Sequence, residues 1–557
     1  FDRSGESVMF SRSHADIKEA DYSFVRSENS VDEKCNVASI GLSRSEHKSL
    51  NYLYYGYAVE TEQEQVSQGL SLDYVFPYSE GESYNNHVYN VDYFFRNKKM
   101  TRACHPVRLG FSQAYAVDVH LGQEKDFYAM MKHSWRTVYA KLRDPLFAVD
   151  FERYYHDIMY LLKDMTGQYG KAWGLPFACQ LPGLDISSVS FQMGFVGQQI
   201  GIAYQRVYYA YAYDDKVMRE KALGIINFWL DNSVSETGVA HVCFQAGSQQ
   251  FEPYPIWIRM LADGMENMLC VYRLLLDRGE EKPACLDYCR RVADWLLKIQ
   301  NADGSFYRAY NEQGEGVMES CATTPMLLRF FAELYRETEE EKYRIAAIKA
   351  GEWALAHSVE KMEYVGATCD NAAVLDKESG IYAMRGFLSL YEMDGDVRWK
   401  KALVASADFT ETWMYAWSYP IRTLWPNHPF NHNHFSGHSL ITVGGDGADG
   451  YMSYCSYDYY RVYEITGDRH YLDVAEFIHH NTKQSSDTSG ACGYKYRALN
   501  HESANFSSQT LGGNYHWLPW CSYVEVDALL RLHKRAGVFD FVSLEEIANK
   551  KANQNLK

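Results

Sequence analysis

Hydrophobic and polar positions between Ile258 and Gln300 predict two helices joined by a short turn. The first helix, from Arg259 to Arg278, is apolar on almost every side, which is typical of a helix that is buried all round. Gly279 then breaks the pattern. The second helix carries its apolar residues at the i, i+3, i+4 spacing of a single face. We therefore predict an inner helix, a short turn and an outer helix.

The same unit recurs along the chain, with an aromatic-rich helix before each turn and, for the first five turns, an amphipathic helix after it. The last turn is followed by a capping-box pattern that predicts a short final helix. Six helix pairs joined by long loops fit a closed ring better than an open solenoid, because closure leaves no apolar end unit to cap. The turns lie at Asp214-Asp215, Arg278-Gly279, Thr338-Glu339, Asp394-Gly395, Thr466-Gly467 and Gly537.

The first part of the chain has another pattern. Residues 51–60, 66–78, 87–96 and 114–121 are rich in Tyr, Val and Leu with partial alternation, and Gly, Ser and Asn separate them. This predicts an antiparallel β-sandwich domain over residues 1–122. Residues 123–189 are predicted to be a linker, with helices over 126–142 and 151–165 and a Gly- and Pro-rich loop after them. The ring domain then occupies residues 190–557, and its first inner helix lies near 195–213.

Six hairpins with short inner-to-outer turns and long outer-to-inner loops resemble the (α/α)6 toroid of the six-hairpin glycosidases. Residues 300–306 (QNADGSF) and 465–471 (ITGDRHY) are similar to segments found across that superfamily. The resemblance covers residues 190–555 and implies a mainly α fold, an (α/α)6 toroid preceded by an antiparallel β-sandwich, as in glucoamylases. It selects no single activity, because such toroids host hydrolases, lyases, epimerases and phosphorylases.

Composition excludes several classes of partner. The formal net charge of −17 argues against nucleic acid or an anionic membrane as the main partner. No apolar run is long enough to predict a membrane-spanning helix. The 12 Cys are scattered and form no CxxC pair. We interpret them as small buried side chains in a reducing compartment, and we expect no metal or other cofactor.

Carboxylates stand just before the predicted inner helices, where the long loops converge over the ring centre. Each one alone also fits a helix cap or a first-turn charge. Together they suit glycoside hydrolysis, which needs one proton donor and one base or nucleophile. These residues are Asp185, Asp263, Glu319, Asp370, Asp376, Glu378, Asp446 and Asp449.

Two of these positions resemble the catalytic motif of the unsaturated glucuronyl hydrolases, in which an Asp at an inner-helix mouth precedes a Met- or aromatic-rich run. The matching segments are Asp263-Gly-Met-Glu-Asn-Met268 and Asp449-Gly-Tyr-Met-Ser-Tyr454. The chain departs from that family in its predicted β-domain and in lacking the flanking tryptophan pattern. We predict Asp263 and Asp449 as the acid/base pair, with Asp446 and Glu319 as the next candidates.

The most unusual segment is residues 425–438, in which four His alternate with Asn and aromatic residues. It allows three interpretations: a metal site, a structural loop of satisfied polar groups, or a carbohydrate subsite with stacking rings and polar donors. We favour the subsite, with Arg422 placed to pair with a uronate carboxylate. The predicted substrate-binding residues are Trp257, Arg422, Trp425, His432, His434, His438, Tyr451, His516 and Trp517.

These observations predict a glycoside hydrolase that cleaves an oligo- or polysaccharide, including one with a uronic-acid residue. The first alternative is a polysaccharide lyase, with a Tyr or His base and Asn or His neutralising the uronate. Sugar epimerases and phosphorylases are further alternatives, and a glycan-binding module is the non-enzymatic one. The expected partner is a carbohydrate, without nucleic acid or membrane, and the sequence predicts no oligomeric state.

Overall fold

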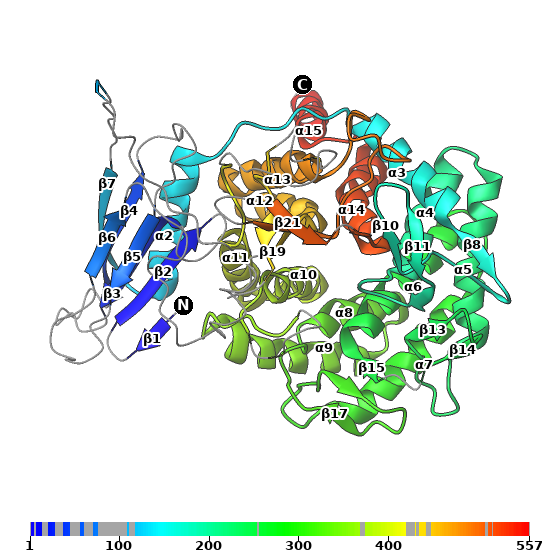
Figure 1. The fold of residues 1–557 in the computed structure, drawn as a ribbon. Helices are drawn as coiled ribbons and strands as arrows, with labels where there is room; N and C mark the ends of the chain where they lie inside the picture. Colours follow the sequence, from blue (N-terminus) through cyan, green and yellow to red (C-terminus); the bar gives the residue numbers. More distant parts are fainter. Residues whose placement is uncertain are drawn as a thin grey trace, which may run out of the picture.

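A computed structural model shows a mainly α-helical protein (Figure 1). It describes residues 109–110 and 117–555, apart from 253–254, 368–371, 373, 419–428, 430–433, 442–446, 507–510 and 515. Before residue 109 it describes only the backbone of six strands. None of the described helices is both long and apolar enough to cross a membrane.

An antiparallel five-stranded sheet with the order β1-β2-β3-β4-β7 forms the first part. Its strands are β1 (Asp2–Ser4), β2 (Ser7–Ser13), β3 (Ala20–Ser27), β4 (Val37–Arg44) and β7 (Val117–Glu124). A hairpin of β5 (Gly56–Glu60) and β6 (Ser71–Val75) lies against β3. Two of the predicted strand segments thus contain β5 and β6, a third overlaps β7, and residues 87–96 lie outside the described residues. A two-sheet sandwich over residues 1–122 stays a prediction.

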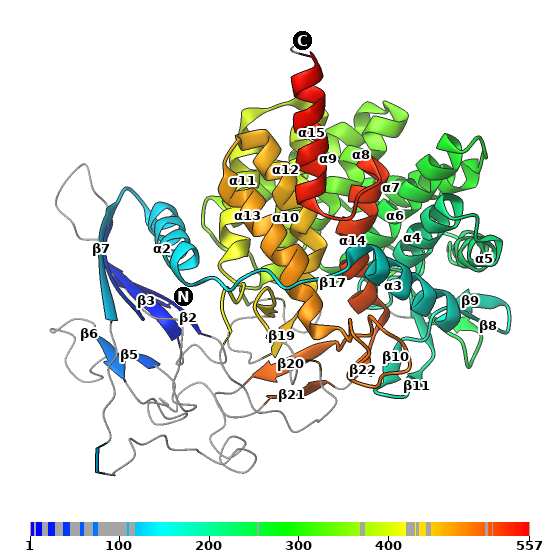
Figure 2. The ribbon, with the colours of Figure 1, turned by 90° about the horizontal axis from the view of Figure 1, so that it is seen from above.

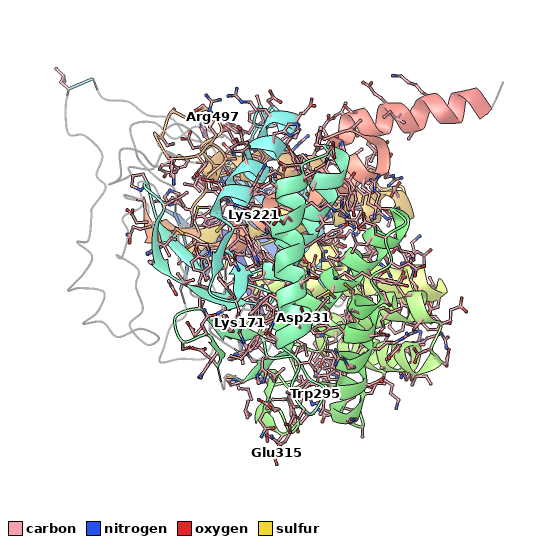
Figure 3. All side chains as sticks on the ribbon, turned by 90° about the vertical axis from the view of Figure 1, so that its right-hand side faces the viewer. Lys171, Lys221, Asp231, Trp295, Glu315 and Arg497 are labelled. Atoms are coloured by element: carbon pink, nitrogen blue, oxygen red, sulfur yellow. The ribbon has the colours of Figure 1, made fainter. Side chains whose placement is uncertain are left out.

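Two helices follow the sheet and match the predicted ranges within a residue. Helix α2 (Phe127–Leu142) begins at the cap Asp126 and lies between the sheet and α11. Helix α3 (Phe151–Met165) packs against α4 and α14 of the ring. Lys221 of α5 (Figure 3) donates hydrogen bonds to two carbonyl groups at the end of α3, those of Lys163 and Thr166. Helix α3 is therefore built into the helical body, and the predicted boundaries at 123, 189 and 190 stay a prediction.

Six inner helices form the ring, and each contacts the next in sequence. They are α4 (Gln199–Ala212), α6 (Ile258–Asp277), α8 (Met326–Thr338), α10 (Lys377–Asp394), α12 (Ser456–Thr466) and α14 (Pro519–Ala536). The last of them, α14, also contacts α4, so the ring is closed as predicted. The outer helices are α5 (Lys216–Asn232), α7 (Pro283–Ile299), α9 (Glu341–Ala354), α11 (Val397–Glu411), α13 (Arg469–Asn481) and α15 (Phe541–Asn555).

All six predicted inner-to-outer turns are present, and each contains a residue with positive φ. Four are glycines, with φ between 70° and 74°, which glycine adopts without steric cost. The other two are Asp214 (φ 51°) and Glu339 (φ 56°). The periodic turn signal in the sequence therefore reflects one backbone geometry that is used six times.

The two ends of the ring differ in what covers them. At the end where the inner helices begin, here named the loop end, most of the connections form short strands (Figure 2). They are β8 (Gly167–Tyr169), β9 (Ala172–Gly174), β10 (Ala178–Gln180), β11 (Asp185–Ser188), β12 (Ser190–Gln192), β13 (Cys243–Gln245), β14 (Gln250–Phe251), β15 (Ile256–Trp257), β16 (Ala309–Tyr310), β17 (Gly316–Met318), β18 (Ser439–Leu440), β19 (Gly447–Asp449), β20 (Ser503–Phe506), β21 (Leu511–Asn514) and β22 (His516–Trp517). At the opposite end, the turn end, lie the six short turns.

Candidate active site

Asp449 is the last residue of β19 and lies at the loop end. Its Oδ1 accepts a hydrogen bond of 2.9 Å from the Tyr451 backbone N–H and forms an ion pair with Lys377, the first residue of α10. The Lys377 side chain is fully buried and that of Asp449 is 4% exposed. Burial raises the pKa of the Asp449 carboxyl above its usual range, and the Lys377 ammonium opposes this rise. The carboxyl is thus able to hold a proton at a higher pH than an ordinary Asp.

A second ion pair joins the neighbouring residue, Glu378, to Arg259 in the first turn of α6. Both side chains are at least 95% buried. The Arg259 guanidinium also donates to the Tyr451 hydroxyl over 3.1 Å and lies 3.4 Å from the ring centre of Phe195. Arg259 is therefore fixed on several sides and pairs with the Glu378 carboxylate. The charge of Glu378 in turn acts on Asp449.

Asp263 lies one turn further into α6 and is fully buried. Its carboxylate accepts hydrogen bonds from the Phe195 N–H (3.1 Å), the Gln198 amide (3.3 Å) and the Tyr382 hydroxyl (2.9 Å). Burial raises its pKa, and Arg259 and these donors oppose the rise. A fully buried carboxylate that accepts hydrogen bonds from three donors is typical of a group that positions other residues. Here it fixes the segment before α4 against α6 and α10.

A third buried ion pair lies beside Gly450. Lys483 and Glu525 are 2.5 Å apart, and both side chains are fully buried. Ser453 connects them, donating to Glu525 over 3.0 Å and accepting from Lys483 over 2.8 Å. Gly450 lies directly against Glu525, because a Cβ added to this glycine would be 3.1 Å from the carboxylate. The ion pair of Lys483 and Glu525 therefore packs against the backbone at Gly450, directly after Asp449.

These side chains form one network, here named the mouth network. It consists of Arg259, Asp263, Lys377, Glu378, Tyr382, Asp449, Tyr451, Lys483 and Glu525. Within it, the Asp449 carboxyl, whose pKa is raised, lies near the Glu378 carboxylate, which is paired with Arg259. Two carboxyl groups in such different environments can divide the roles of proton donor and base between them.

The predicted site residues are distributed unevenly. Asp263, Asp449 and Tyr451 meet in the mouth network. Glu319 is exposed on the connection after β17 and is not part of the mouth network. Asp376 caps α10 by accepting from the Ser379 N–H, which is the structural alternative considered for these carboxylates.

The aromatic and His residues predicted to bind substrate lie in different environments. Trp517 is fully buried and its indole N–H donates to Ser522, so its ring packs in the core. Trp257 is half-buried against the Arg308 guanidinium. His434 is exposed, and His516 is half-buried opposite Gln180 in the sheet. Arg422, Trp425, His432 and Asp446 lie outside the described residues.

His438 differs from the other candidates in its electrostatic environment. It is 2% exposed, and burial lowers its pKa to about 4, so the ring is neutral at physiological pH. Its Nδ1 lies 2.9 Å from the Phe435 carbonyl. Among the residues that the structure describes, no three His, Cys, Asp or Glu side chains cluster in a way that could hold a metal ion.

Sequence reasoning missed most of the partners that hold the candidate carboxylates. Arg259, Lys377, Tyr382, Lys483 and Glu525 were not singled out, although each is buried in the structure. One signal was available for two of them. Arg259 and Lys377 are basic residues in the first turn of largely apolar inner helices, where the helix dipole disfavours a cation unless an anion is close by.

The comparisons with known proteins agree with the ring architecture. No protein-family model and no curated protein matches the chain. Among solved structures, a cellobiose 2-epimerase from Bacillus thermoamylovorans is similar, with a TM-score of 0.52, 12% identity, and coverage of 69% of this chain and 99% of that one. A D-mannose isomerase matches with a TM-score of 0.51 and 9% identity over 67% of this chain and 95% of its own.

A sugar epimerase from a ruminal bacterium matches with a TM-score of 0.51 and 12% identity, covering 69% of this chain and 99% of its own. At these identities the likeness concerns the fold alone. The neighbours belong to the six-hairpin (α/α)6 glycosidase superfamily, and no single close family stands out among them. The chain thus has the predicted toroid fold.

Proposed function

We propose that this protein is a carbohydrate-active enzyme, and specifically a glycoside hydrolase with Asp449 as the general acid and Glu378 as the base or nucleophile. The observation that carries the proposal is the pair of buried carboxyl groups in unlike environments at the loop end. Burial raises the pKa of Asp449, whereas Arg259 is paired with Glu378. An oligo- or polysaccharide is the substrate class that such a pair suits.

The chemistry follows from the two environments. The protonated Asp449 carboxyl donates its proton to the glycosidic oxygen as the bond to the sugar breaks. The Lys377 ammonium then stabilises the carboxylate that remains. Glu378 either activates a water molecule or attacks the sugar carbon, and its ion pair with Arg259 holds it in position. We assign Asp263 a positioning role, because its oxygens are occupied by donors from three residues.

The substrate side of the proposal rests on the sequence prediction for one segment and on Trp257. We keep the segment 425–438, with Arg422, as the proposed binding region for a sugar, including a uronic acid. Trp257 at the start of α6 is the described aromatic residue placed to join it, since it is half-buried and directly precedes the first turn that carries Arg259.

The test is digestion of a panel of neutral and uronate-containing glycans in water enriched in ¹⁸O, followed by mass spectrometry. A hydrolase adds one labelled water to its product. The isosteric variants Asp449→Asn and Glu378→Gln should each lose at least about 100-fold in kcat/KM. Glu352→Gln, on the exposed face of α9, is the matched control and should keep full activity. Normal turnover in a folded Asp449→Asn variant would remove the assignment.

A sugar epimerase or isomerase is the second candidate, because the similar structures with TM-scores above 0.5 carry those names. Such an enzyme changes no mass and exchanges a carbon-bound proton. Incubation of mono- and disaccharides in D₂O would show deuterium at the epimerised carbon by NMR. Deuterium uptake without any gain of water would replace the hydrolase proposal.

A polysaccharide lyase is less well supported by this geometry. Burial and the nearby carboxylates raise the pKa of the Tyr451 hydroxyl, which makes it a poor base. An increase in ultraviolet absorbance on a uronate polymer, from the new C=C bond, would nevertheless favour the lyase over both other candidates.

A further inference from the structure

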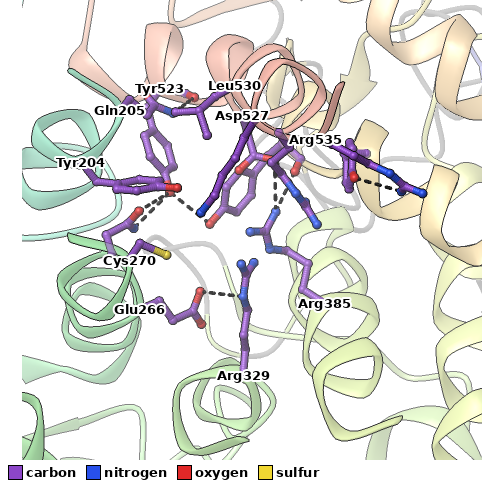
Figure 4. A pocket seen from close by; sticks show the side chains of 15 residues that line it. Tyr204, Gln205, Glu266, Cys270, Arg329, Arg385, Tyr523, Asp527, Leu530 and Arg535 are labelled. Carbon is purple, nitrogen blue, oxygen red and sulfur yellow. Dashed lines mark hydrogen bonds and ion pairs between the residues drawn. The ribbon is translucent and has the colours of Figure 1, made fainter. Parts of the chain in front are cut away.

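A polar cavity lies within the ring, on the turn-end side of the mouth network. Its volume is about 430 Å³, which is within the range of small-molecule sites. The side chains that line it come from all six inner helices and from the turn before α12 (Figure 4). Five of the lining residues are cations and two are carboxylates, namely Arg329, Arg385, Arg531, Lys534 and Arg535 against Glu266 and Asp527.

Three of the five cations are paired within the protein. Arg385 and Arg531 share Asp458, at 2.9 and 2.8 Å. Arg531 also reaches Asp527 at 3.3 Å, and Arg535 pairs with Glu464 on the same side of the ring. These contacts explain the positions of the three side chains without any ligand.

Two cations have no such explanation. The Arg329 guanidinium donates no hydrogen bond to any described residue, and its nearest carboxylate oxygen, on Glu266, is 3.6 Å away. Figure 4 shows this guanidinium pointing toward that of Arg385. Lys534 has no carboxylate partner within 4.0 Å among the described residues, although its charge acts on Cys270 in the cavity wall. Arg329 is thus held only by a long ion pair to Glu266, and Lys534 has no carboxylate within ion-pair distance among the described residues.

Stabilisation of the helix ends does not account for all of this charge. Lys534 and Arg535 lie in the last turn of α14, where a cation interacts favourably with the helix dipole. Arg329 lies in the first turn of α8 and Arg385 in the middle of α10, where this effect is absent or reversed. Glu266 and Asp458 act electrostatically on both guanidinium groups, and a further anion in the cavity would relieve the repulsion that remains between them.

We propose that this cavity binds a small polar molecule through its phosphate or sulfate monoester group, with Arg329 and Lys534 as the principal ligands of the oxyanion. A tetrahedral oxyanion accepts several hydrogen bonds and suits the planar fork of an arginine. The other walls are polar and suit a hydroxylated body. They include Tyr204, Gln205, Asn267 and Tyr523.

The proposed anion site is separate from the mouth network. Asn267 lies between them, because its amide donates to the Asp263 carbonyl at 2.8 Å and to the Tyr523 hydroxyl at 3.1 Å. Tyr523 is in turn 3.4 Å from the Tyr454 hydroxyl. This layer of three buried side chains separates the cavity from the candidate carboxylates, so the anion site does not depend on the hydrolase proposal.

Isothermal titration calorimetry of the full chain at constant ionic strength tests the proposal. The probes are glucose 6-phosphate, glucose 6-sulfate, inorganic phosphate, inorganic sulfate and glucose. We expect at least one monoester to bind more tightly than its inorganic anion, and the comparison of phosphate with sulfate identifies the preferred group. Glucose itself should not bind at this cavity.

Two variants and a control locate the binding. Arg329→Met should weaken the affinity by about tenfold or more, because a charge-assisted contact is lost. Lys534→Met, at an exposed position that does not threaten folding, should weaken it by roughly threefold. Lys550→Met on the exposed face of α15 is the matched control and should leave the affinity unchanged. The proposal is overturned if no monoester binds, if inorganic anions bind as tightly, or if Lys534→Met has no effect.

Discussion

The two ends of the ring place charge in opposite ways. At the loop end, four carboxylates accompany three cations, and each cation contacts a carboxylate at short range. Deeper in the ring, toward the turn end, five cations line a cavity with only two carboxylates. The helix dipole favours Lys534 and Arg535 in the last turn of α14, but not Arg329 in the first turn of α8 or Arg385 in the middle of α10. The loop end therefore contains closed ion pairs, whereas the wall of the cavity has more cations than carboxylates.

The largest effect should come from breaking a closed pair at the loop end. Lys483→Met leaves Glu525 buried without its cation and should cost about 3–5 kcal/mol in the free energy of unfolding. Urea titration monitored by circular dichroism measures this cost. The double variant Lys483→Met/Glu525→Leu should recover more than half of it. A single variant that costs under about 1 kcal/mol would mean that this pair is not the closed unit described here.

Glu266 at the turn end should make stability depend on pH. Burial raises its pKa to about 7, and Arg329 opposes the rise. Between pH 4.5 and 7 the folded state thus binds more protons than the unfolded state, so stability falls as pH rises. Glu266→Gln should remove up to about 3 kcal/mol of this fall, measured as the difference from the unchanged protein in unfolding titrations at pH 5 and pH 8. Parallel pH profiles for the two proteins would contradict the assignment.

The two facing arginines should respond differently to the same substitution. Arg385→Met removes one of two cations from the buried Asp458 and should cost about 2 kcal/mol. Arg329→Met removes a cation that donates no hydrogen bond and should cost less than about 1 kcal/mol, measured without added anions. Thermal unfolding of both variants side by side gives the comparison. Equal costs would show that Arg329 has a structural role.

The smallest effects concern the six turns. At Gly467 an added Cβ meets no atom within 4 Å, so Gly467→Ala should cost only about 1 kcal/mol, from its positive φ. Glu339→Gly changes the residue in the opposite direction at an equivalent turn, and should stabilise by a few tenths of a kcal/mol. The melting temperatures of the two variants should move in opposite directions, and a shared direction would break the equivalence of the turns.

The sequence predicted the helical part well, because the information there is local. The six turns, the ranges of α2 and α3 and the closure of the ring follow from apolar periodicity and from residues that tolerate positive φ. These signals need only a few neighbouring residues to be visible. The β-domain was harder, because strand pairing such as that of β4 with β7 joins segments that are far apart in the chain.

The candidate site could be predicted only in part. Asp263 and Asp449 were identified from their expected positions before inner helices, although Asp263 lies within α6, and the partners that define their environments were not identified. Lys377 and Asp449 are 72 residues apart, and no local pattern connects them. Arg329 is equally invisible, since it resembles an ordinary polar residue on an amphipathic helix until the ring brings Arg385 opposite to it.

The contact between α14 and α4 also has a consequence for how the molecule unfolds. In an open array, a terminal repeat can fray and expose one interface, so stability decreases gradually along the chain. In a closed ring, every hairpin has two neighbours, and the loss of any one exposes two apolar faces at once. Helix α3, which packs against both helices at the seam, adds to the cost of opening there. We therefore expect the twelve helices of the ring to melt as a single cooperative unit, with uniform protection from hydrogen exchange around its circumference.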